Sequence, residues 1–374
     1  MMLHISSAFD SGNIVVKDMS DPRDIRLNIR KDTKSDFYQW FYFRITGAKG
    51  QACRMVIENA KGAAFVGGWD GYKAVASYDR DDWFRIPTTR YENGQLIIEV
   101  TPEQDSLYIA YFAPYSMERH ADLIAECVQQ EGVSLNVIGH SIEGQSLDCL
   151  IVGEGPKPIW VIARQHPGES MAEWWMEGFL SRLLDTDDDV AMSLRKAATF
   201  YVVPNMNPDG SCRGNLRTNV NGANLNREWG VATLENSPEV LHTIAAMDKA
   251  KPVLCLDVHG DESLPYNFIA GAEGIPGYTE KQAKDLADFL SAYKKASPDF
   301  QTKHGYATTA PGKANLTMCT NFTAHRYDCL AMTLEMPFKD NADYPDESVG
   351  WSPDRAAQLG FDALNAIRDV VEQL

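Results

Sequence analysis

The chain has 374 residues, of which 44% are hydrophobic and 23% are charged. This length and composition are typical of a globular protein with one large α/β unit and a smaller one, and they exclude a disordered or fibrous chain. The 52 Asp and Glu residues outnumber the 35 Lys and Arg residues, so the formal net charge is -17, which argues against nucleic acid and anionic membranes as partners.

The cellular location is predicted from the cysteines and from the start of the chain. The seven cysteines are an odd number without a CxxC pair, so a disulfide framework is not expected and a reducing compartment is favoured. Residues 1–6 lack the basic start and the apolar core of a signal peptide. No apolar run approaches the roughly 20 residues that span a bilayer. We therefore expect a soluble cytoplasmic protein, whose oligomeric state the sequence does not indicate.

Residues 1–112 are predicted to form a small antiparallel β-sandwich domain. Four runs in this part of the chain are rich in aromatic and β-branched residues, at positions 38–45, 54–58, 95–100 and 107–112. Gly, Asp and Asn residues separate them, and many short strands with turn residues between them are typical of a sandwich. Nothing in the sequence indicates what this domain contributes.

The pattern changes after about residue 113, where Ser116 is expected to cap a helix that runs to about residue 130. Beyond this helix, apolar strand candidates alternate with helical segments. The strands are expected at positions 159–163, 199–203, 253–258 and 330–334. Residues 113–374 are therefore predicted to form an α/β domain with a mixed β-sheet flanked by helices.

Ionisable side chains follow three of these predicted strands. His166 and Glu169 come after the first strand. His259 directly follows the third strand, and Glu335 directly follows the fourth. Because ligands gather beyond the carboxyl ends of strands in open α/β sheets, we expect these side chains to converge. Two imidazoles and a carboxylate can supply the three protein ligands of an open catalytic zinc site. The sequence therefore predicts one zinc ion bound by His166, Glu169 and His259.

Glu335 is predicted to be the general base. An ionisable residue that closes an apolar run needs a reason to be there, and a carboxylate beside the attacking water can take its proton and pass it to the leaving nitrogen. Arg217, at the start of a polar, Asn-rich stretch, is predicted to stabilise the oxyanion. Asn226 and Arg227 would bind the α-carboxylate of a substrate, since a guanidinium fork pairs with a carboxylate through two parallel hydrogen bonds.

Together these segments resemble the zinc carboxypeptidase family. The H-P-G-E sequence at 166–169 is similar to the H-x-x-E ligand motif of that family. The stretch at 217–227 is similar to its loop carrying the oxyanion arginine and the Asn-Arg carboxylate clamp. His259 and Glu335 match the third ligand and the general base. The resemblance implies a metallocarboxypeptidase that removes single residues from the C-termini of peptides or proteins.

Within that family the chain looks like the cytosolic carboxypeptidase branch, in a short bacterial-type form. This resemblance rests on the sequences at 39–43, 114–116, 207–210 and 257–260. Branch members are linked to the trimming of acidic residues, Glu above all, so the resemblance implies a preference for acidic C-terminal residues. Lys313 and Arg326 are the candidate cations that would bind such a side chain.

The sequence departs from the family at the loop position where an Asp usually orients a zinc-binding His, because this position is Asn224. A neutral Asn still accepts a hydrogen bond but leaves the His less basic, and such changes cost ~10–100-fold in metal affinity or activity. Asp257 should face the same side of its strand as His259 and is expected to compensate in part. The family's substrate-clamping tyrosine has no single counterpart. The candidates are Tyr266, Tyr278, Tyr306 and Tyr327.

Two other functions stay open. A zinc-dependent deacylase of N-acyl amino acids would use the same three-ligand scaffold, but the separate β-rich domain and the complete carboxylate clamp argue against it. A catalytically weak relative that only binds peptides is kept open by Asn224.

Overall fold

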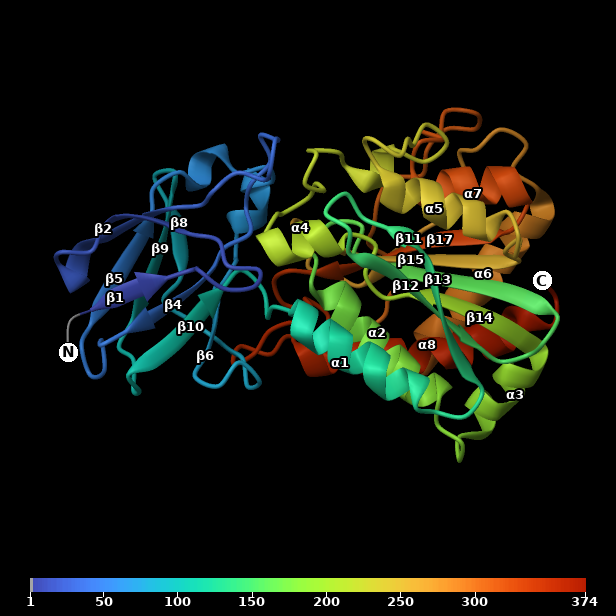
Figure 1. Ribbon diagram of the computed structural model, residues 1–374, viewed down its shortest axis with the longest axis horizontal. Coiled ribbons are helices and arrows are strands. Elements are labelled where there is room, and N and C mark those ends of the chain that lie inside the picture. Colours follow the sequence, from blue (N-terminus) through green and yellow to red (C-terminus); the bar gives the residue numbers. More distant parts are fainter. Residues whose placement is uncertain (1–2) are drawn as a thin grey trace.

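The computed structural model describes residues 3–374. Its strands form two five-stranded sheets from the N-terminal part of the chain and one seven-stranded sheet from the remainder. Figure 1 shows the two small sheets in one lobe on the left and the large sheet with its helices in a second lobe on the right. The predicted fold class, with antiparallel strands followed by a mixed sheet flanked by helices, is confirmed. The proposed division into domains 1–112 and 113–374 stays a prediction.

The first small sheet has the order β1-β4-β10-β6-β7, and all its neighbours are antiparallel. Its strands are β1 (His4–Ser6), β4 (Tyr42–Thr46), β10 (Ser106–Ala110), β6 (Val75–Ser77) and β7 (Phe84–Arg85). The second small sheet has the order β2-β3-β5-β9-β8. Its strands are β2 (Val15–Asp18), β3 (Ile25–Asn28), β5 (Cys53–Ile57), β9 (Gln95–Val100) and β8 (Arg90–Glu92). One pair, β3 with β5, runs parallel, which the sequence pattern did not indicate.

Aromatic side chains fill the core of this lobe. Trp40, Phe41, Trp69, Tyr72 and Tyr111 are all buried there. Tyr111 also stacks on Phe338 of the C-terminal lobe, with ring centroids 4.7 Å apart, so the two lobes share packing. Three short 3-10 helices complete the lobe. They are η1 (Pro22–Asp24), η2 (Ala60–Gly62) and η3 (Val66–Trp69).

The large sheet has the order β11-β12-β14-β13-β15-β17-β16. Its strands are β11 (Val133–His140), β12 (Ser146–Val152), β14 (Ala198–Val203), β13 (Lys157–Ala163), β15 (Leu254–Asp261), β17 (Leu330–Pro337) and β16 (Phe268–Ala270). The four central strands, β14, β13, β15 and β17, are parallel to one another. Strands β12 and β16 run antiparallel to them, and the edge strand β11, antiparallel to β12, runs in the direction of the central strands. The central strands are almost wholly buried because helices cover both faces of the sheet.

The helices divide between the two faces. Helices α5 (Pro238–Met247) and α7 (Cys319–Tyr327) pack on one face together with the 3-10 turn η4 (Leu225–Arg227). The opposite face is covered by α1 (Met117–Val128), α2 (Met171–Leu183), α3 (Asp189–Ala197), α6 (Glu280–Ala296) and α8 (Pro353–Val371). The short helix α4 (Pro208–Arg213) lies at the junction of the lobes (Figure 1). Ser116 caps α1 as predicted, accepting a hydrogen bond from the Arg119 N–H.

Helices α2 and α8 approach each other closely because glycines stand at their crossing. A Cβ atom at Gly178 would collide with the carbonyl group of Ala357, and one at Gly360 would collide with the carbonyl oxygen of Trp175. These glycines therefore lower the helix propensity but allow the two backbones to pack closely. The crossing anchors α2, which directly follows the H-P-G-E sequence.

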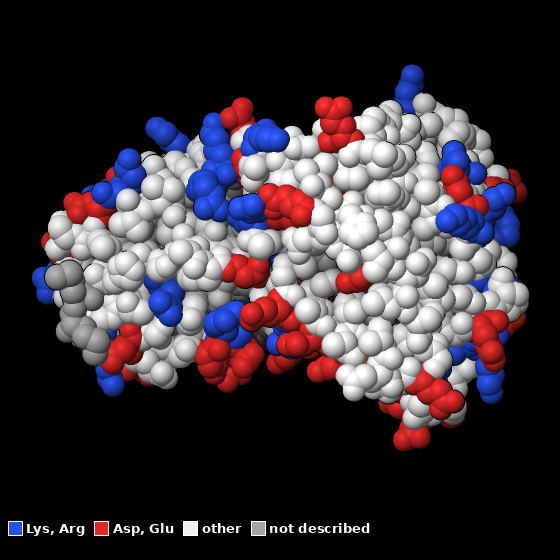
Figure 2. Space-filling view, viewed as in Figure 1, with Lys and Arg blue, Asp and Glu red and all other residues white. Residues whose placement is uncertain are grey.

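On the face shown in Figure 2, basic and acidic residues are interspersed. Figure 2 shows acidic and basic side chains near the ends of the molecule and around the junction of the lobes, with a broad uncharged area over β11 and β12. In the part of the chain that the structure describes, none of the helices combines the length and hydropathy needed to cross a bilayer. All seven cysteines are free.

Candidate active site

The side chains of His166, Glu169 and His259 converge at the carboxyl ends of β13 and β15. His166 Nδ1 lies 2.6 Å from Glu169 Oε1, and His259 Nδ1 lies 2.7 Å from Glu169 Oε2. The two Nδ1 atoms are 3.2 Å apart, and all three residues are buried. One ligand atom from each residue lies within 4.8 Å of the others. Two imidazole nitrogens and a carboxylate oxygen that face one point are a donor set that zinc prefers.

Polar partners behind the two rings orient them toward this point. The Nε2 of His166 lies 3.0 Å from Asn224 Oδ1, and the Nε2 of His259 lies 2.9 Å from Asp257 Oδ2. With both Nε2 atoms engaged, both Nδ1 atoms face the centre, and such outer partners fix the ring orientation of metal-binding histidines. Asp257 therefore contacts a different ring from the one that Asn224 contacts. The residues fit a zinc ion.

The charges at the centre favour the ligand forms of Glu169 and His166. For His259, burial opposes protonation, but the Asp257 and Glu169 carboxylates outweigh it and raise the pKa well above its ordinary value. Burial opposes ionisation of Glu169, but the two adjacent imidazoles outweigh it and hold the pKa of this carboxyl below its ordinary value. Burial also lowers the pKa of His166 to about 4, and the positive charge of Arg217 acts in the same direction. A carboxylate and a neutral imidazole are the forms that bind a metal ion.

The turn that carries His166 and Glu169 is held by a residue in an unusual conformation. Arg164, at the end of β13, is fully buried and has φ 57°. Its guanidinium donates to the Pro167 carbonyl oxygen at 3.1 Å and to Glu173 on α2 at 2.6 Å. The left-handed backbone turns the chain sharply out of the strand, and buried hydrogen bonds offset the cost of that conformation.

Glu335 lies beside this cluster on the neighbouring strand. In the parallel ladder of β15 and β17, Glu335 is the register partner of His259. Its side chain is 8% exposed, and burial raises the pKa of its carboxyl well above the ordinary value, with the positive charge of His259 opposing this. Within residues 3–374, its Oε2 atom is buried and has no hydrogen-bond partner. A carboxylate oxygen that is free to accept a proton in a protected site suits a general base.

Tyr306 is the tyrosine that lies at the site. Its hydroxyl is 2.6 Å from Asp261 Oδ2 and 3.2 Å from Glu335 Oε1, and the residue is 52% exposed. Of the other candidates, Tyr327 bonds to Asp248, and Tyr266 stacks on the ring of His304. No sequence signal separated Tyr306 from them, since it lies in an irregular segment between α6 and α7.

Three further predicted site residues lie near this centre, and the charge of Arg217 acts on His166. Asn226 Nδ2 lies 3.5 Å from His259 Nε2, and the Asn226 Oδ1 atom accepts a hydrogen bond from the Cys319 N–H. Arg227 donates to the Asn226 carbonyl oxygen at 2.6 Å. The guanidinium carbon of Arg217 lies 5.2 Å from the centre of the Phe65 ring, in the N-terminal lobe.

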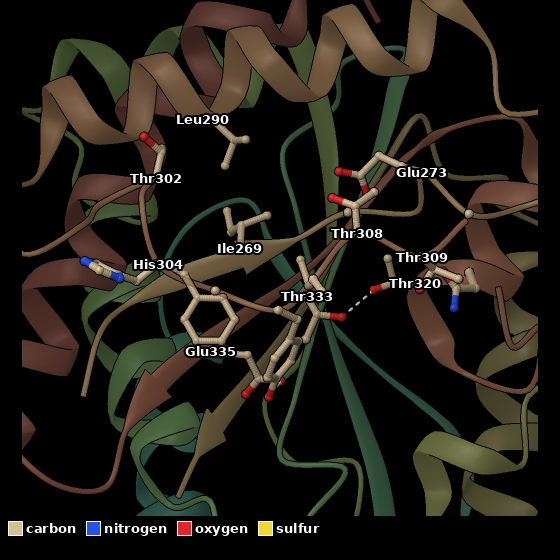
Figure 3. Close-up of a pocket in the computed structure, with 18 of the residues that line it drawn as sticks. Ile269, Glu273, Leu290, Thr302, His304, Thr308, Thr309, Thr320, Thr333 and Glu335 are labelled. Carbon is tan, nitrogen blue, oxygen red and sulfur yellow. Dashed lines mark hydrogen bonds between the residues drawn. The ribbon is translucent and has the colours of Figure 1, made fainter. Parts of the chain in front are cut away.

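A pocket opens directly beside Glu335. It has a volume of about 310 Å³, and its walls include Asn226 and Tyr306. Deeper in it, the Thr320 and Thr333 hydroxyls form a hydrogen bond of 2.6 Å. Figure 3 shows this hydroxyl pair near the middle of the pocket, with Glu335 at one edge and Glu273 on the far side. Apolar walls come from Ile269 and Leu290.

The two cations predicted to bind an acidic side chain do not line this pocket. Arg326, in the last turn of α7, instead forms an ion pair with Asp248 at 2.9 Å. Lys313 is exposed on the segment before α7. Among the residues that the structure describes, the lining does include Lys303 and His304, which the sequence argument did not single out. Lys303 is therefore a further candidate for the cation, beside Lys313 and Arg326, which stay predictions.

Comparison with known families agrees with this geometry. The model of a family described as zinc carboxypeptidase matches residues 123–349, which is more than half of the chain. The chain belongs to the zinc carboxypeptidase family. A second model, described as the cytosolic carboxypeptidase N-terminal domain, matches residues 5–112. The family implies a zinc cofactor.

Relatives and solved structures support the same family. An uncharacterized protein of Zymomonas mobilis is 53% identical over 100% of this chain and 98% of its own length. Human cytosolic carboxypeptidase 1 is 28% identical over 72% of this chain, which spans only 26% of that protein. A metallo-carboxypeptidase from Burkholderia cenocepacia has a TM-score of 0.96 and 48% identity, with 100% of both chains covered. One from Pseudomonas aeruginosa, solved in complex with (2-guanidinoethylmercapto)succinic acid, has a TM-score of 0.96 and 44% identity, with 99% of both chains covered.

Proposed function

We propose that this protein is a zinc metallocarboxypeptidase that hydrolyses the C-terminal peptide bond of peptides or proteins. The observation that carries this proposal is the meeting of His166, Glu169 and His259 beside Glu335, at the mouth of a pocket of about 310 Å³. Asn226, whose amide suits a carboxylate, lines the same pocket, and Arg227 directly follows it in the chain. Family membership supports the reaction class.

The chain's own groups suggest how the reaction proceeds. A zinc ion held by the three ligands would supply Lewis acidity that polarises the scissile carbonyl and acidifies water. Glu335 takes the proton of the attacking water and returns it to the leaving nitrogen. Arg217 stabilises the negative charge that develops on the carbonyl oxygen. Asn226 and Arg227 hold the terminal carboxylate, and the Tyr306 hydroxyl closes over the bound C-terminal residue.

The decisive test is the variant Glu335→Gln, assayed for release of a C-terminal amino acid from a peptide library by mass spectrometry. Loss of the general base should lower kcat by about 10²–10⁴-fold, with zinc content unchanged. Asp362→Asn is a matched control, because Asp362 is a buried carboxyl on α8 outside the site. Full activity of the Glu335 variant would contradict the proposal.

The alternative reactions are separated by their substrates. A deacylase would cleave N-acyl amino acids faster than peptides, and a peptide-binding relative would bind peptides without turnover in the presence of zinc. The contact between Asn226 and the backbone of α7, beside a pocket for one side chain, favours a clamp for a peptide C-terminus. Cleavage rates measured side by side on peptides and on N-acyl amino acids distinguish these functions.

We further propose that the pocket receives the side chain of the C-terminal residue and prefers an acidic one, with Lys303 as its cation. Lys303 lies in the lining, which supports this preference, whereas Glu273 on the far wall opposes it. The (2-guanidinoethylmercapto)succinic acid in the Pseudomonas aeruginosa structure carries two carboxyl groups and a guanidino group, so a basic side chain is the alternative that the following measurement tests.

The measurement compares kcat/KM for peptides that end in Glu, Leu and Lys. Lys303→Met should lower the value for the Glu peptide about ten-fold, since one charged contact contributes about 1.4 kcal/mol or more, and should leave the Leu peptide unchanged. Preferred cleavage of the Lys peptide, abolished by Glu273→Gln, would instead assign a basic preference.

We propose that peptide or protein C-terminal tails are the substrates and that the protein acts in the cytoplasm, as the names of its cytosolic carboxypeptidase relatives suggest. Nucleic acid and membranes are not proposed as partners, because the net charge of -17 disfavours both.

A further inference from the structure

A carboxylate of the N-terminal lobe holds the backbone on both sides of Arg217. Asp32 is 4% exposed and lies in the segment after β3. Its Oδ1 atom accepts a hydrogen bond from the Leu216 N–H at 2.6 Å. Its Oδ2 atom accepts from the Arg217 N–H at 2.8 Å, from the Thr218 N–H at 3.0 Å and from the Thr218 hydroxyl at 3.1 Å. Four donors on one buried carboxylate form a strong, charge-assisted anchor.

Other residues of the N-terminal lobe also contact this segment, residues 214–224. Asn13 donates to the Gly214 carbonyl oxygen at 2.8 Å, and Lys34 donates to Asn221 at 2.8 Å. A Cβ atom at Gly214 would lie 2.6 Å from the Ser11 carbonyl oxygen, so the backbones touch there. Residues 214–224 contain no helix or strand of their own. Contacts with the lobe therefore help to set their conformation, together with hydrogen bonds inside the segment such as that from the Gly222 N–H to the Asn219 carbonyl oxygen.

This anchor acts on the active site by two routes. The Arg217 guanidinium lies over two rings of the N-terminal lobe, 5.2 Å from the centre of Phe65 and 5.8 Å from that of Phe37. Leu216, which donates its N–H to Asp32, accepts a hydrogen bond on its carbonyl oxygen from the Gly168 N–H at 2.8 Å. Gly168 lies within the turn that carries the ligands His166 and Glu169. The lobe thus contacts both the guanidinium and, through one residue, the metal-binding turn.

We propose that Asp32 is a positioning residue for Arg217 and that the N-terminal lobe thereby completes the active site. This inference rests on the carboxypeptidase function proposed above, in which Arg217 stabilises the oxyanion. A guanidinium acts on a developing charge only if it is held in place before the reaction, because reorganisation during the reaction would cost the stabilisation it gives. The Asp32 carboxylate fixes the backbone from which Arg217 extends, and the Phe37 and Phe65 rings fix its far end.

The test replaces Asp32 by Asn, which keeps the size but has only one accepting oxygen, so that an NH₂ group faces at least one loop donor. The variant should lower kcat on a C-terminal peptide about 10–100-fold, as expected for a small displacement of a catalytic group, with KM changed less than about three-fold. Zinc stoichiometry should stay unchanged. Asp79→Asn is the matched control, because Asp79 accepts from two backbone N–H groups and a serine hydroxyl in the same lobe without contacting the loop.

A double-mutant cycle distinguishes positioning from a general effect on folding. If Asp32 acts through Arg217, then Asp32→Asn should change kcat less than about two-fold in an Arg217→Met background. An equal loss of kcat in the wild-type and Arg217→Met backgrounds would overturn the proposal. Should Asp32→Asn fail to fold, Phe65→Leu takes its place. That variant should lower kcat in the wild-type background only, and a normal kcat for it would overturn the proposal.

Hydrogen exchange provides a readout that does not need activity. The amides of residues 216–218 should exchange at least about ten-fold faster in Asp32→Asn than in the wild type or in Asp79→Asn, because they lose their buried acceptor. Unchanged exchange would refute the anchor itself. If exchange rises as expected but the wild-type protein cleaves no peptide, the failure lies in the proposed function and not in the anchor.

Discussion

Replacing Asn224 by Asp should strengthen zinc binding. The Asn224 Oδ1 atom is 3.0 Å from His166 Nε2 and is the only recorded partner of that nitrogen within residues 3–374. A neutral hydrogen bond contributes about 1 kcal/mol, whereas one to a charged group contributes about 1.5–3 kcal/mol. The difference is about 1.4 kcal/mol, which corresponds to a ten-fold gain in affinity. Zinc affinity should increase because a carboxylate partner makes the imidazole a better electron donor to the metal.

The assay is the zinc dissociation constant, measured by competition with a chromophoric chelator. Asn221→Asp is the matched control, since it adds the same charge three positions earlier in the chain. The Asn221 side chain bonds to Lys34 and to the Glu235 carbonyl oxygen and does not contact a ligand residue. We expect the control to change zinc affinity less than about two-fold, because exposed charges are screened by solvent.

Two results would refute this reasoning. Unchanged or weaker zinc affinity in Asn224→Asp would show that basicity of His166 does not limit binding. An equal gain in both variants would show that the added negative charge acts over distance rather than through the hydrogen bond to the ring.

Two further predictions concern stability. Burial opposes the charged form of His120, but its ion pair with Glu173 at 2.5 Å and a second carboxylate outweigh this and raise its pKa to about 9. Because the unfolded pKa is about 6.5, this stabilisation is complete below about pH 6.5 and is lost as the pH rises through about 9, on the order of 3 kcal/mol in all. Tm should therefore fall more steeply over that pH range in the wild type than in His120→Gln. If Tm depends on pH in the same way in both proteins, the raised pKa of His120 is contradicted. Gly178→Ala should lower the free energy of unfolding by about 2 kcal/mol in urea titrations, because its Cβ would collide with the backbone of α8; Gly67→Ala, which meets no atom within 4 Å, serves as control, and equal stabilities would refute the packing argument.

The sequence alone located the residues that meet at the centre. His166, His259 and Glu335 follow apolar runs that could be recognised as strands, and the structure gives these runs as β13, β15 and β17. Parallel neighbouring strands bring their carboxyl ends to one edge of a sheet. Local pattern was therefore sufficient to predict which side chains converge, while the metal they bind and the roles of Arg217 and Glu335 stay predictions.

Tertiary structure alone decided what surrounds that centre. Tyr306 and Lys303 lie on an irregular segment whose path is set by long-range packing, so nothing in the sequence separated Tyr306 from the other tyrosines or favoured Lys303 over Lys313. Asp32 is 184 residues away from Leu216, and no local periodicity connects them. Strand ends are predictable because backbone hydrogen bonding repeats regularly along a sheet, whereas a loop takes its shape from whichever distant groups accept its unpaired N–H donors.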